Sequence, residues 1–164
     1  MIKRFFAFVR LLCLIPLLSG CFFANLFDFG PKIDLGKNQW KIVSFTLGGE
    51  AFIPSNFEDI PFMRFDTKEL KIHGNTGCNR FFASYVWIDD KKIEIRRSGL
   101  TRKMCQSDES VRFEQKLMEE FDGGFEVIEG ENTLMLKNEN LQINLIAFEG
   151  GLPQTEDTQQ EQAQ

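Results

Sequence analysis

The sequence has 164 residues, which is enough for one domain with a hydrophobic core and short for two. Apolar residues make up 43% of the chain, and 18 Phe against two Trp and one Tyr predict a core rich in phenylalanine. The formal net charge of −5 argues against nucleic-acid binding, because proteins of that class concentrate Lys and Arg.

The first twenty residues differ from the rest of the chain. Three basic residues occur among them, no acid does, and an apolar run ends in the small residues Ser19-Gly20. This layout is typical of a secretory signal peptide, which we expect to span residues 1–20. The alternative is an uncleaved membrane helix. Such a helix needs about 20 apolar residues, whereas this run is shorter and is interrupted by Arg10 and Pro16.

The tetrapeptide Leu18-Ser19-Gly20-Cys21 resembles the lipobox of bacterial lipoproteins. The resemblance implies transfer of diacylglycerol to the Cys21 thiol, cleavage before Cys21 and acylation of the new amine. Phe22, rather than Asp, follows Cys21, which favours the periplasmic face of the outer membrane over the inner membrane. The alternative is an ordinary signal peptide followed by a chance cysteine.

Cleavage before Cys21 makes the chain more acidic. It leaves 16 Lys or Arg against 24 Asp or Glu, a net charge of −8. Anionic headgroups repel such a domain, so the acyl chains on Cys21, rather than surface charge, are expected to hold it at the membrane.

Two of the four cysteines remain available in the mature domain. Cys13 leaves with the signal peptide and Cys21 carries lipid, which leaves Cys78 and Cys105. An even pair in an exported domain predicts a disulfide, whose loop would restrict the unfolded chain by about 3.5 kcal/mol. Free buried thiols are one alternative, and a metal or redox site is another. A metal site usually needs three or four ligands, however, and a redox pair usually has a Cys-x-x-Cys spacing, which Cys78 and Cys105 lack.

The pattern along the chain predicts one β-rich domain between two extensions. Residues 21–37 are expected to form a lipidated tether, and residues 149–164, rich in Gln, Glu, Thr and Asp, a disordered tail. Between them lies a domain over 38–148 in which short β-branched and aromatic runs alternate with turn residues. Eight strands are expected, at residues 39–45, 62–65, 70–74, 81–87, 93–96, 125–128, 133–137 and 141–148.

One helix is predicted from Ser107 to Phe121. Ser107 or Asp108 can cap its start, and Gly123-Gly124 follows its end. An apolar stripe with a four-residue repeat, formed by Phe113, Leu117 and Phe121, is expected to cover a sheet. The polar residues Glu114, Lys116, Glu119 and Glu120 are expected to face water.

Two further features invite a functional reading. His73 could be catalytic, because an imidazole side chain commonly serves as an acid or base, but no nucleophile motif or carboxylate cluster accompanies it in the sequence, which favours a half-exposed strand residue. The turn Gly74-x-x-Gly77 could bind phosphate, but it matches neither the dinucleotide nor the P-loop pattern. A tight bend that delivers Cys78 to its partner is the favoured interpretation.

A set of motif residues occurs in a fixed order along the domain: Trp40, Phe65, Gly74-x-x-Gly77-Cys78-Asn79-Arg80, Tyr85, Thr101-x-x-Met104-Cys105, and a helix with Glu109 or Glu114, Phe113 and Leu117. This order resembles the META domain family, which includes the heat-inducible HslJ-like bacterial lipoproteins. Lys103 departs from the family pattern, in which a small residue is more common there.

The resemblance implies an α+β, mainly β fold, in which one helix packs on a curved antiparallel sheet like an open or cracked barrel. It also implies a role without established catalysis, since members are linked to outer-membrane integrity, heat response and resistance to a hydrophobic antibiotic. We therefore expect no catalytic residue, cofactor or metal.

The first functional hypothesis is a lipid-anchored accessory protein that binds another envelope component, either a protein or a lipid. The alternative is a carrier of a small hydrophobic ligand or lipid, similar to the cracked-barrel pilotins. An apolar cavity between the helix stripe and the sheet would favour the carrier, and a filled core the accessory protein. An enzyme would need a cleft that gathers His73 with a carboxylate and a nucleophile.

Overall fold

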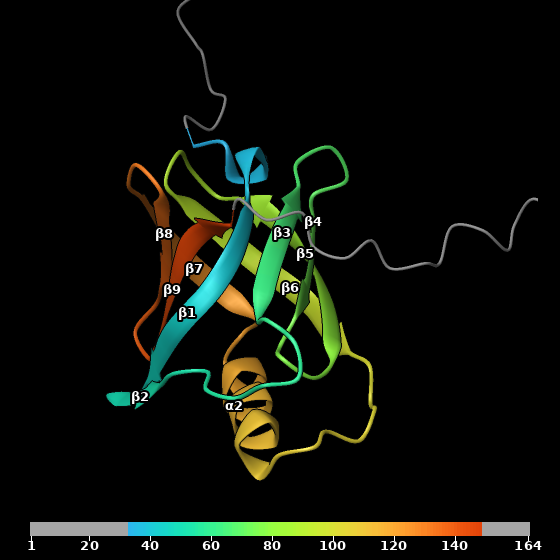
Figure 1. Ribbon diagram of the computed structural model, residues 1–164. Coiled ribbons are helices and arrows are strands. Elements are labelled where there is room, and N and C mark those ends of the chain that lie inside the picture. The colour runs from blue at the N-terminus through green and yellow to red at the C-terminus, as the bar shows by residue number, and fades with distance from the viewer. Residues whose placement is uncertain (1–32, 149–164) are drawn as a thin grey trace, which may run out of the picture. The chain divides into compact units, whose positions relative to one another are not determined.

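The computed structural model describes residues 33–148. The expected signal peptide, Cys21 and the expected tail lie outside this range. These residues form a 3₁₀ helix, an α-helix and nine strands (Figure 1). Neither helix is long and apolar enough to cross a membrane. The elements are η1 (Leu35–Lys37), β1 (Gln39–Leu47), β2 (Glu50–Phe52), β3 (Phe62–Asp66), β4 (Lys71–Asn75), β5 (Arg80–Trp87), β6 (Lys92–Leu100), α2 (Asp108–Glu119), β7 (Gly123–Glu129), β8 (Thr133–Lys137) and β9 (Leu141–Phe148).

The antiparallel sheet closes into a barrel of eight strands. Strands β3 to β9 pair in sequence order, and β1 pairs with both β3 and β9. The pairing of β1 with β9 runs from Gln39↔Phe148 to Leu47↔Leu141. Its pairing with β3 covers only three residue pairs, ending at Lys41↔Phe62. The expected mainly β fold is confirmed, and the structure adds that the barrel is closed.

The additional strand β2 is not among the eight strands expected from the sequence. Gly48 and Gly49 have φ angles of 56° and 88°, a conformation that suits a two-residue hairpin turn. They connect β1 to β2, which pairs with the last three residues of β1. The two glycines therefore do not end the sheet but continue it by one short strand.

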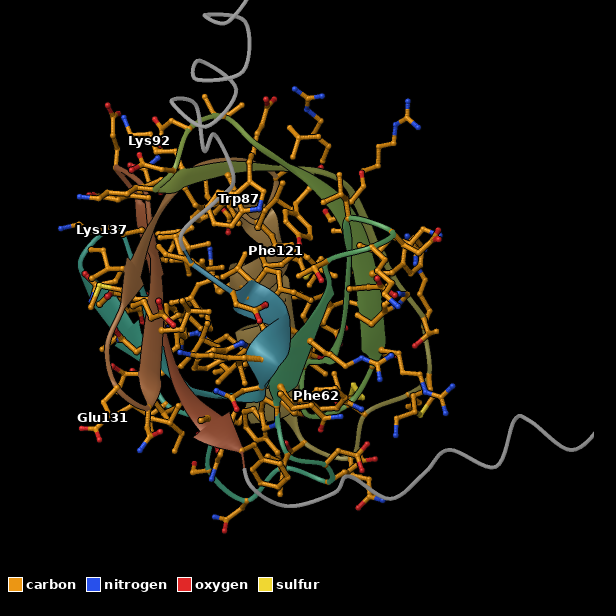
Figure 2. The ribbon with its side chains drawn as sticks, turned by 90° about the horizontal axis from the view of Figure 1, so that it is seen from above. Phe62, Trp87, Lys92, Phe121, Glu131 and Lys137 are labelled. Carbon is orange, nitrogen blue, oxygen red and sulfur yellow. A yellow bond between two sulfur atoms is a disulfide. The ribbon has the colours of Figure 1, made fainter. Side chains whose placement is uncertain are left out.

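Side chains fill the inside of the barrel. The strands alternate between buried and exposed positions, as in β4, where Ile72 is buried between exposed Lys71 and His73. Figure 2, seen along the barrel, shows side chains crowding the space enclosed by the strands. The largest side chains with less than 2% exposure are Trp40, Tyr85, Phe45, Phe81, Phe121 and Phe125.

The two helices lie at opposite ends of the barrel (Figure 1), which we call the η1 end and the α2 end. At the η1 end, Leu35 is 1% exposed and its carbonyl oxygen accepts a hydrogen bond of 3.0 Å from Trp40 Nε1. Asp34 caps η1 by accepting a hydrogen bond from Gly36 N. The folded part therefore includes residues that the sequence pattern assigned to the tether.

Helix α2 forms where it was expected. Ser107 caps it by accepting a hydrogen bond of 3.1 Å from Ser110 N, and Asp108 and Glu109 lie in the first turn, where the helix dipole favours acids. The predicted apolar stripe is buried: Phe113 packs edge-on against Phe45, with ring centroids 4.8 Å apart, and Phe121, just beyond the helix, packs against Phe81.

Candidate functional site

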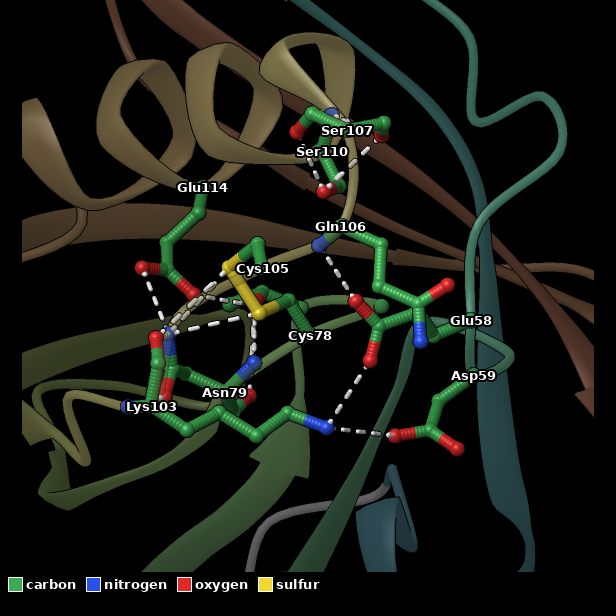
Figure 3. Close-up of a disulfide and its surroundings, with 12 residues drawn as sticks. Glu58, Asp59, Cys78, Asn79, Lys103, Cys105, Gln106, Ser107, Ser110 and Glu114 are labelled. Atoms are coloured by element: carbon green, nitrogen blue, oxygen red, sulfur yellow. Dashed lines mark hydrogen bonds and ion pairs between the residues drawn. A yellow bond between two sulfur atoms is a disulfide. The ribbon is translucent and has the colours of Figure 1, made fainter.

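The two cysteine-bearing motifs meet at the α2 end. The turn between β4 and β5 carries Cys78, and the segment between β6 and α2 carries Cys105. The structure joins them by a disulfide, with Cα atoms 5.6 Å apart (Figure 3). Cys78 is 2% exposed. The bond fastens the irregular segment before α2 to the wall of the barrel.

Glycines allow the turn that presents Cys78. Gly77 has a φ of +98°, and a Cβ atom there would lie 2.3 Å from the Phe57 ring. A Cβ at Gly74 would lie 2.3 Å from both the Phe62 carbonyl oxygen and the Phe81 ring. Both glycines are therefore required by close packing, which supports the tight bend expected from the sequence over a phosphate-binding loop.

The Asn79 amide connects three segments. Its Oδ1 accepts hydrogen bonds from Lys103 N at 2.7 Å and from Thr101 Oγ1 at 3.0 Å, across to the segment before α2. Its Nδ2 donates to Glu114 Oε1 on α2 at 3.1 Å. Because Asn79 is only 2% exposed, these bonds replace the water that it loses on folding.

Glu114 was expected to face water, and this prediction is wrong. The residue is 8% exposed, and its Oε2 accepts a hydrogen bond of 2.6 Å from Thr76 Oγ1. A buried carboxyl group is costly unless it is hydrogen-bonded, and here both oxygens have donors. Glu114 lies about one helical turn from Ser110 and from Leu117, which are both buried. Its place on the same face of the helix could have indicated its burial. We call Thr76, Cys78, Asn79, Cys105 and Glu114 the motif cluster.

A second set of contacts ties the loop between β2 and β3 to the motif cluster. Glu58 accepts hydrogen bonds from Gln106 N at 2.6 Å and from Lys103 Nζ at 3.2 Å (Figure 3). The bond from the Gln106 backbone, followed by that from Lys103, lowers the pKa of Glu58. Lys103 thus holds this loop to the segment before α2 through an exposed ion pair.

A small hollow lies beneath the same loop. Its volume is about 200 Å³, which is below the roughly 300–1,000 Å³ of typical ligand pockets. Its lining residues are Lys41, Pro54, Phe57, Glu58, Asp59, Ile60 and Pro61.

The remaining motif residues are spread over the domain. Thr101 and Arg80 exchange backbone contacts, with Thr101 N donating to the Arg80 carbonyl oxygen at 2.9 Å. Met104 is 95% exposed beside the disulfide. Trp40, by contrast, contacts η1 at the other end of the barrel. Cys21 lies outside the described residues.

His73 lies on the outer surface of the sheet. This residue is exposed on β4, in register with Arg64 on β3 and Phe82 on β5. Among residues 33–148, no cluster of three or more His, Cys, Asp or Glu side chains could hold a metal ion. The contacts of the motif cluster hold separate segments of the fold together.

The family model of the META domain matches residues 33–147. This chain belongs to the META domain family. The matched range includes the complete motif cluster, and it begins before Leu35, in agreement with the burial of that residue in this META domain.

Solved structures resemble this META domain in fold. A protein from Burkholderia xenovorans, studied by NMR, has a TM-score of 0.58 at 18% identity, over 71% of this chain and 85% of that chain. Another NMR structure has a TM-score of 0.54 at 18% identity, over 69% and 91% of the two chains. A lipocalin-like protein from Bacteroides uniformis ATCC 8492 has a TM-score of 0.44 at 16% identity, over 70% and 100%. No curated protein matches the sequence.

Proposed function

We propose that this META domain protein is a non-catalytic accessory protein of the bacterial envelope. Lipid on Cys21 holds it at the periplasmic face of the outer membrane, and it works by binding another envelope component on its surface. The observation that carries this proposal is the filled interior of the barrel, which is covered by η1 at one end and α2 at the other.

The filled interior favours surface binding over carriage of a ligand inside the barrel. An eight-stranded barrel is wide enough either for side chains or for one small ligand. Here Trp40, Tyr85 and Phe121 are each 1% exposed or less. The apolar stripe of α2 packs directly against strand residues, so it provides a lid over a packed core rather than a wall of a cavity.

The disulfide supports export. Cytosolic thiols are kept reduced, whereas disulfides persist in the periplasm and outside the cell. Cys78 is buried and the bridge connects two segments of the motif cluster, so its role is structural. An exported fold that needs this bridge is consistent with the signal peptide and lipobox expected at residues 1–21.

The two ends of the barrel favour separate roles, one for the anchor and one for the binding of a partner. The described chain begins beside η1, while the motif cluster lies at the α2 end (Figure 1). A tether on Cys21 therefore joins the domain at the η1 end, opposite the cluster. Met104 projects there, at 95% exposure, from a segment held rigidly by the disulfide and Asn79, which is a suitable arrangement for contact with a partner.

Site-specific photo-crosslinking in cells tests this proposal. A photoreactive residue at Met104 should give a discrete adduct, and the same residue at Glu131, in the turn at the η1 end, should not. Acylation of Cys21 and membrane association are measured in the same cells, with Cys21→Ala as the unprocessed control. A correctly anchored protein without an adduct at Met104, which purifies with one apolar molecule per chain, would contradict surface binding and favour the carrier.

A further inference from the structure

Charge is divided unevenly over the surface of this acidic protein. The four neighbouring strands β3, β4, β5 and β6 contain six Lys or Arg against two Asp or Glu, a net of +4. The other described residues contain nine Lys or Arg against 17 Asp or Glu, a net of −8. The sequence hides this division, because the cations become neighbours only when the strands pair. We call the outer surface of β3–β6 the basic face.

An exposed aromatic ring lies within the basic face. Arg64, His73 and Phe82 are direct neighbours across three strands, and all three point outward. Phe82 is 53% exposed, an unusual position for a phenylalanine in the middle of a strand. It pairs with Gly99 on β6, where a Cβ atom would come within 2.7 Å of the ring, so Gly99 permits the ring to rest on the sheet.

The acids in and beside the basic face offset its charge only in part. Asp66 accepts hydrogen bonds from Lys68 N and Glu69 N, and the bond from Glu69 N most of all, with smaller effects from the charges of Arg64 and His73, lowers the pKa of Asp66. Lys71 forms an ion pair with Glu69. Glu94 is occupied by an ion pair with Arg96. Arg64 and Arg97 have no ion-pair partner among residues 33–148. A net positive surface beside an exposed aromatic residue has the features needed to bind anions and apolar groups together.

We propose that the basic face docks on an anionic phospholipid surface, with Phe82 entering the interface between headgroups and acyl chains. The cations are distributed over neighbouring strands about 4.8 Å apart rather than converging on one point, which fits an array of phosphates better than a single phosphate. Basic residues near a membrane attract anionic headgroups, and an aromatic side chain adds interfacial affinity. The proposal differs from the expectation that the domain as a whole is repelled.

Chain length favours a membrane over an acidic protein as the occupant. Only residues 22–32 separate Cys21 from the described domain. Eleven residues span at most about 40 Å, so a lipid on Cys21 would keep the basic face close to the bilayer at all times. The inference rests on the proposed function for this proximity, and its test must separate the acyl anchor from the basic face.

Tryptophan quenching by brominated lipids provides that test. The acylated protein carries Trp87→Phe to remove the partly exposed native tryptophan, and Phe82→Trp as a probe; Trp40 is buried and stays as a constant background. A matched control probe is Ile128→Trp on β7, where the native side chain is 44% exposed. Both proteins are incorporated into phosphatidylcholine vesicles with or without phosphatidylglycerol, and flotation reports the acyl anchor independently.

We expect the tryptophan at position 82 to be quenched only when phosphatidylglycerol is present, and the tryptophan at position 128 to remain unquenched. High salt should abolish the quenching at position 82, because it screens exposed charges. Arg64→Glu should reduce quenching at position 82 severalfold, whereas Lys137→Glu, an equal charge reversal on β8, should not.

If the protein floats with the vesicles but position 82 stays unquenched at every composition, the basic face does not bind lipid and an acidic protein is its better partner. Failure to float would instead refute the anchor. Equal quenching without phosphatidylglycerol would overturn the electrostatic part of the proposal.

Discussion

Asn79 and Glu114 are 35 residues apart in the chain, yet Asn79 Nδ2 donates a hydrogen bond of 3.1 Å to Glu114 Oε1. This bond connects α2 to the turn that carries Cys78. With the disulfide and the hydrogen bond from Lys103 N to Asn79 Oδ1, it fixes the α2 end by three separate contacts. The residues of the motif cluster are thus explained by the segments that they hold together at the α2 end.

Removal of the Glu114 carboxyl group should destabilise the domain. Glu114→Ala removes the carboxylate acceptor of the buried Thr76 hydroxyl and Asn79 amide and leaves them with longer bonds to backbone carbonyls, so the free energy of unfolding should fall by about 2–3 kcal/mol. Urea unfolding followed by circular dichroism measures this change. Glu119→Ala, on the exposed side of α2, is the control and should change the value by less than about 1 kcal/mol. Equal losses in the two variants would refute the role of the buried network.

Loss of the disulfide should cost more than loss of any single hydrogen bond. The two cysteines are 27 residues apart, and opening the loop should lower the free energy of unfolding by about 3–4 kcal/mol. The double variant Cys78→Ala/Cys105→Ala and the reduced native chain should lose similar amounts. The double variant should itself be insensitive to reductant. A native protein whose unfolding curve does not respond to reductant would rule out the bridge.

Tyr85 provides a spectroscopic test of the barrel interior, because it is the only tyrosine in the chain. Its hydroxyl is buried without a hydrogen-bond partner among the described residues. Burial first, and then the charges of Asp66 and Asp34, raise its pKa from 10.0 to about 12. Absorbance of tyrosinate near 295 nm should therefore rise with a midpoint near pH 12 in the folded protein, against about pH 10 when it is unfolded.

The same shift predicts a loss of stability at alkaline pH. The unfolded state releases the Tyr85 proton first, so the contribution of this residue is complete below pH 10 and is lost as pH rises toward 12. Tyr85→Phe removes the unsatisfied hydroxyl and should unfold with a weaker pH dependence in this range. A native midpoint near pH 10 under folding conditions would show that water reaches the interior.

Gly74 should tolerate no side chain. An alanine Cβ there would lie 2.3 Å from the Phe62 carbonyl oxygen, so strands β3 and β4 would have to separate. Gly74→Ala should reduce the free energy of unfolding by about 1–3 kcal/mol, as overpacking does in other cores. Gly124→Ala, where nothing lies within 4 Å of the added atom, should be close to neutral. Comparable thermal midpoints for the two variants would contradict the close packing at Gly74.

Local patterns in the sequence were sufficient for most of the fold. The four-residue repeat of Phe113, Leu117 and Phe121 located α2, and the alternation around Ile72 located β4, because each pattern depends on a period within one element. The boundary at residue 38 placed Leu35 in the tether because a single leucine before a strand carries no period. Leu35 is buried at the η1 end of the barrel, which forms only when strands that are distant in the sequence come together.

The features that matter most for binding were not local. Glu114 looks exposed beside Lys116 and Glu119, and only the approach of Thr76 and Asn79 makes its burial favourable. Likewise, Arg64, His73 and Phe82 are nine residues apart in succession, and antiparallel pairing alone brings them into one row. The sequence could identify the cysteines of the motif cluster, but not the acid that completes it or the basic face.

Intact mass spectrometry of the protein extracted from membranes without reductant tests the central claim most directly. The account predicts a chain that begins at Cys21, carries a diacylglyceryl group and an amide-linked acyl chain, and gains two hydrogen masses only after reduction of Cys78–Cys105. A chain that still begins at Met1, with an unmodified Cys21 and two free thiols, would contradict it.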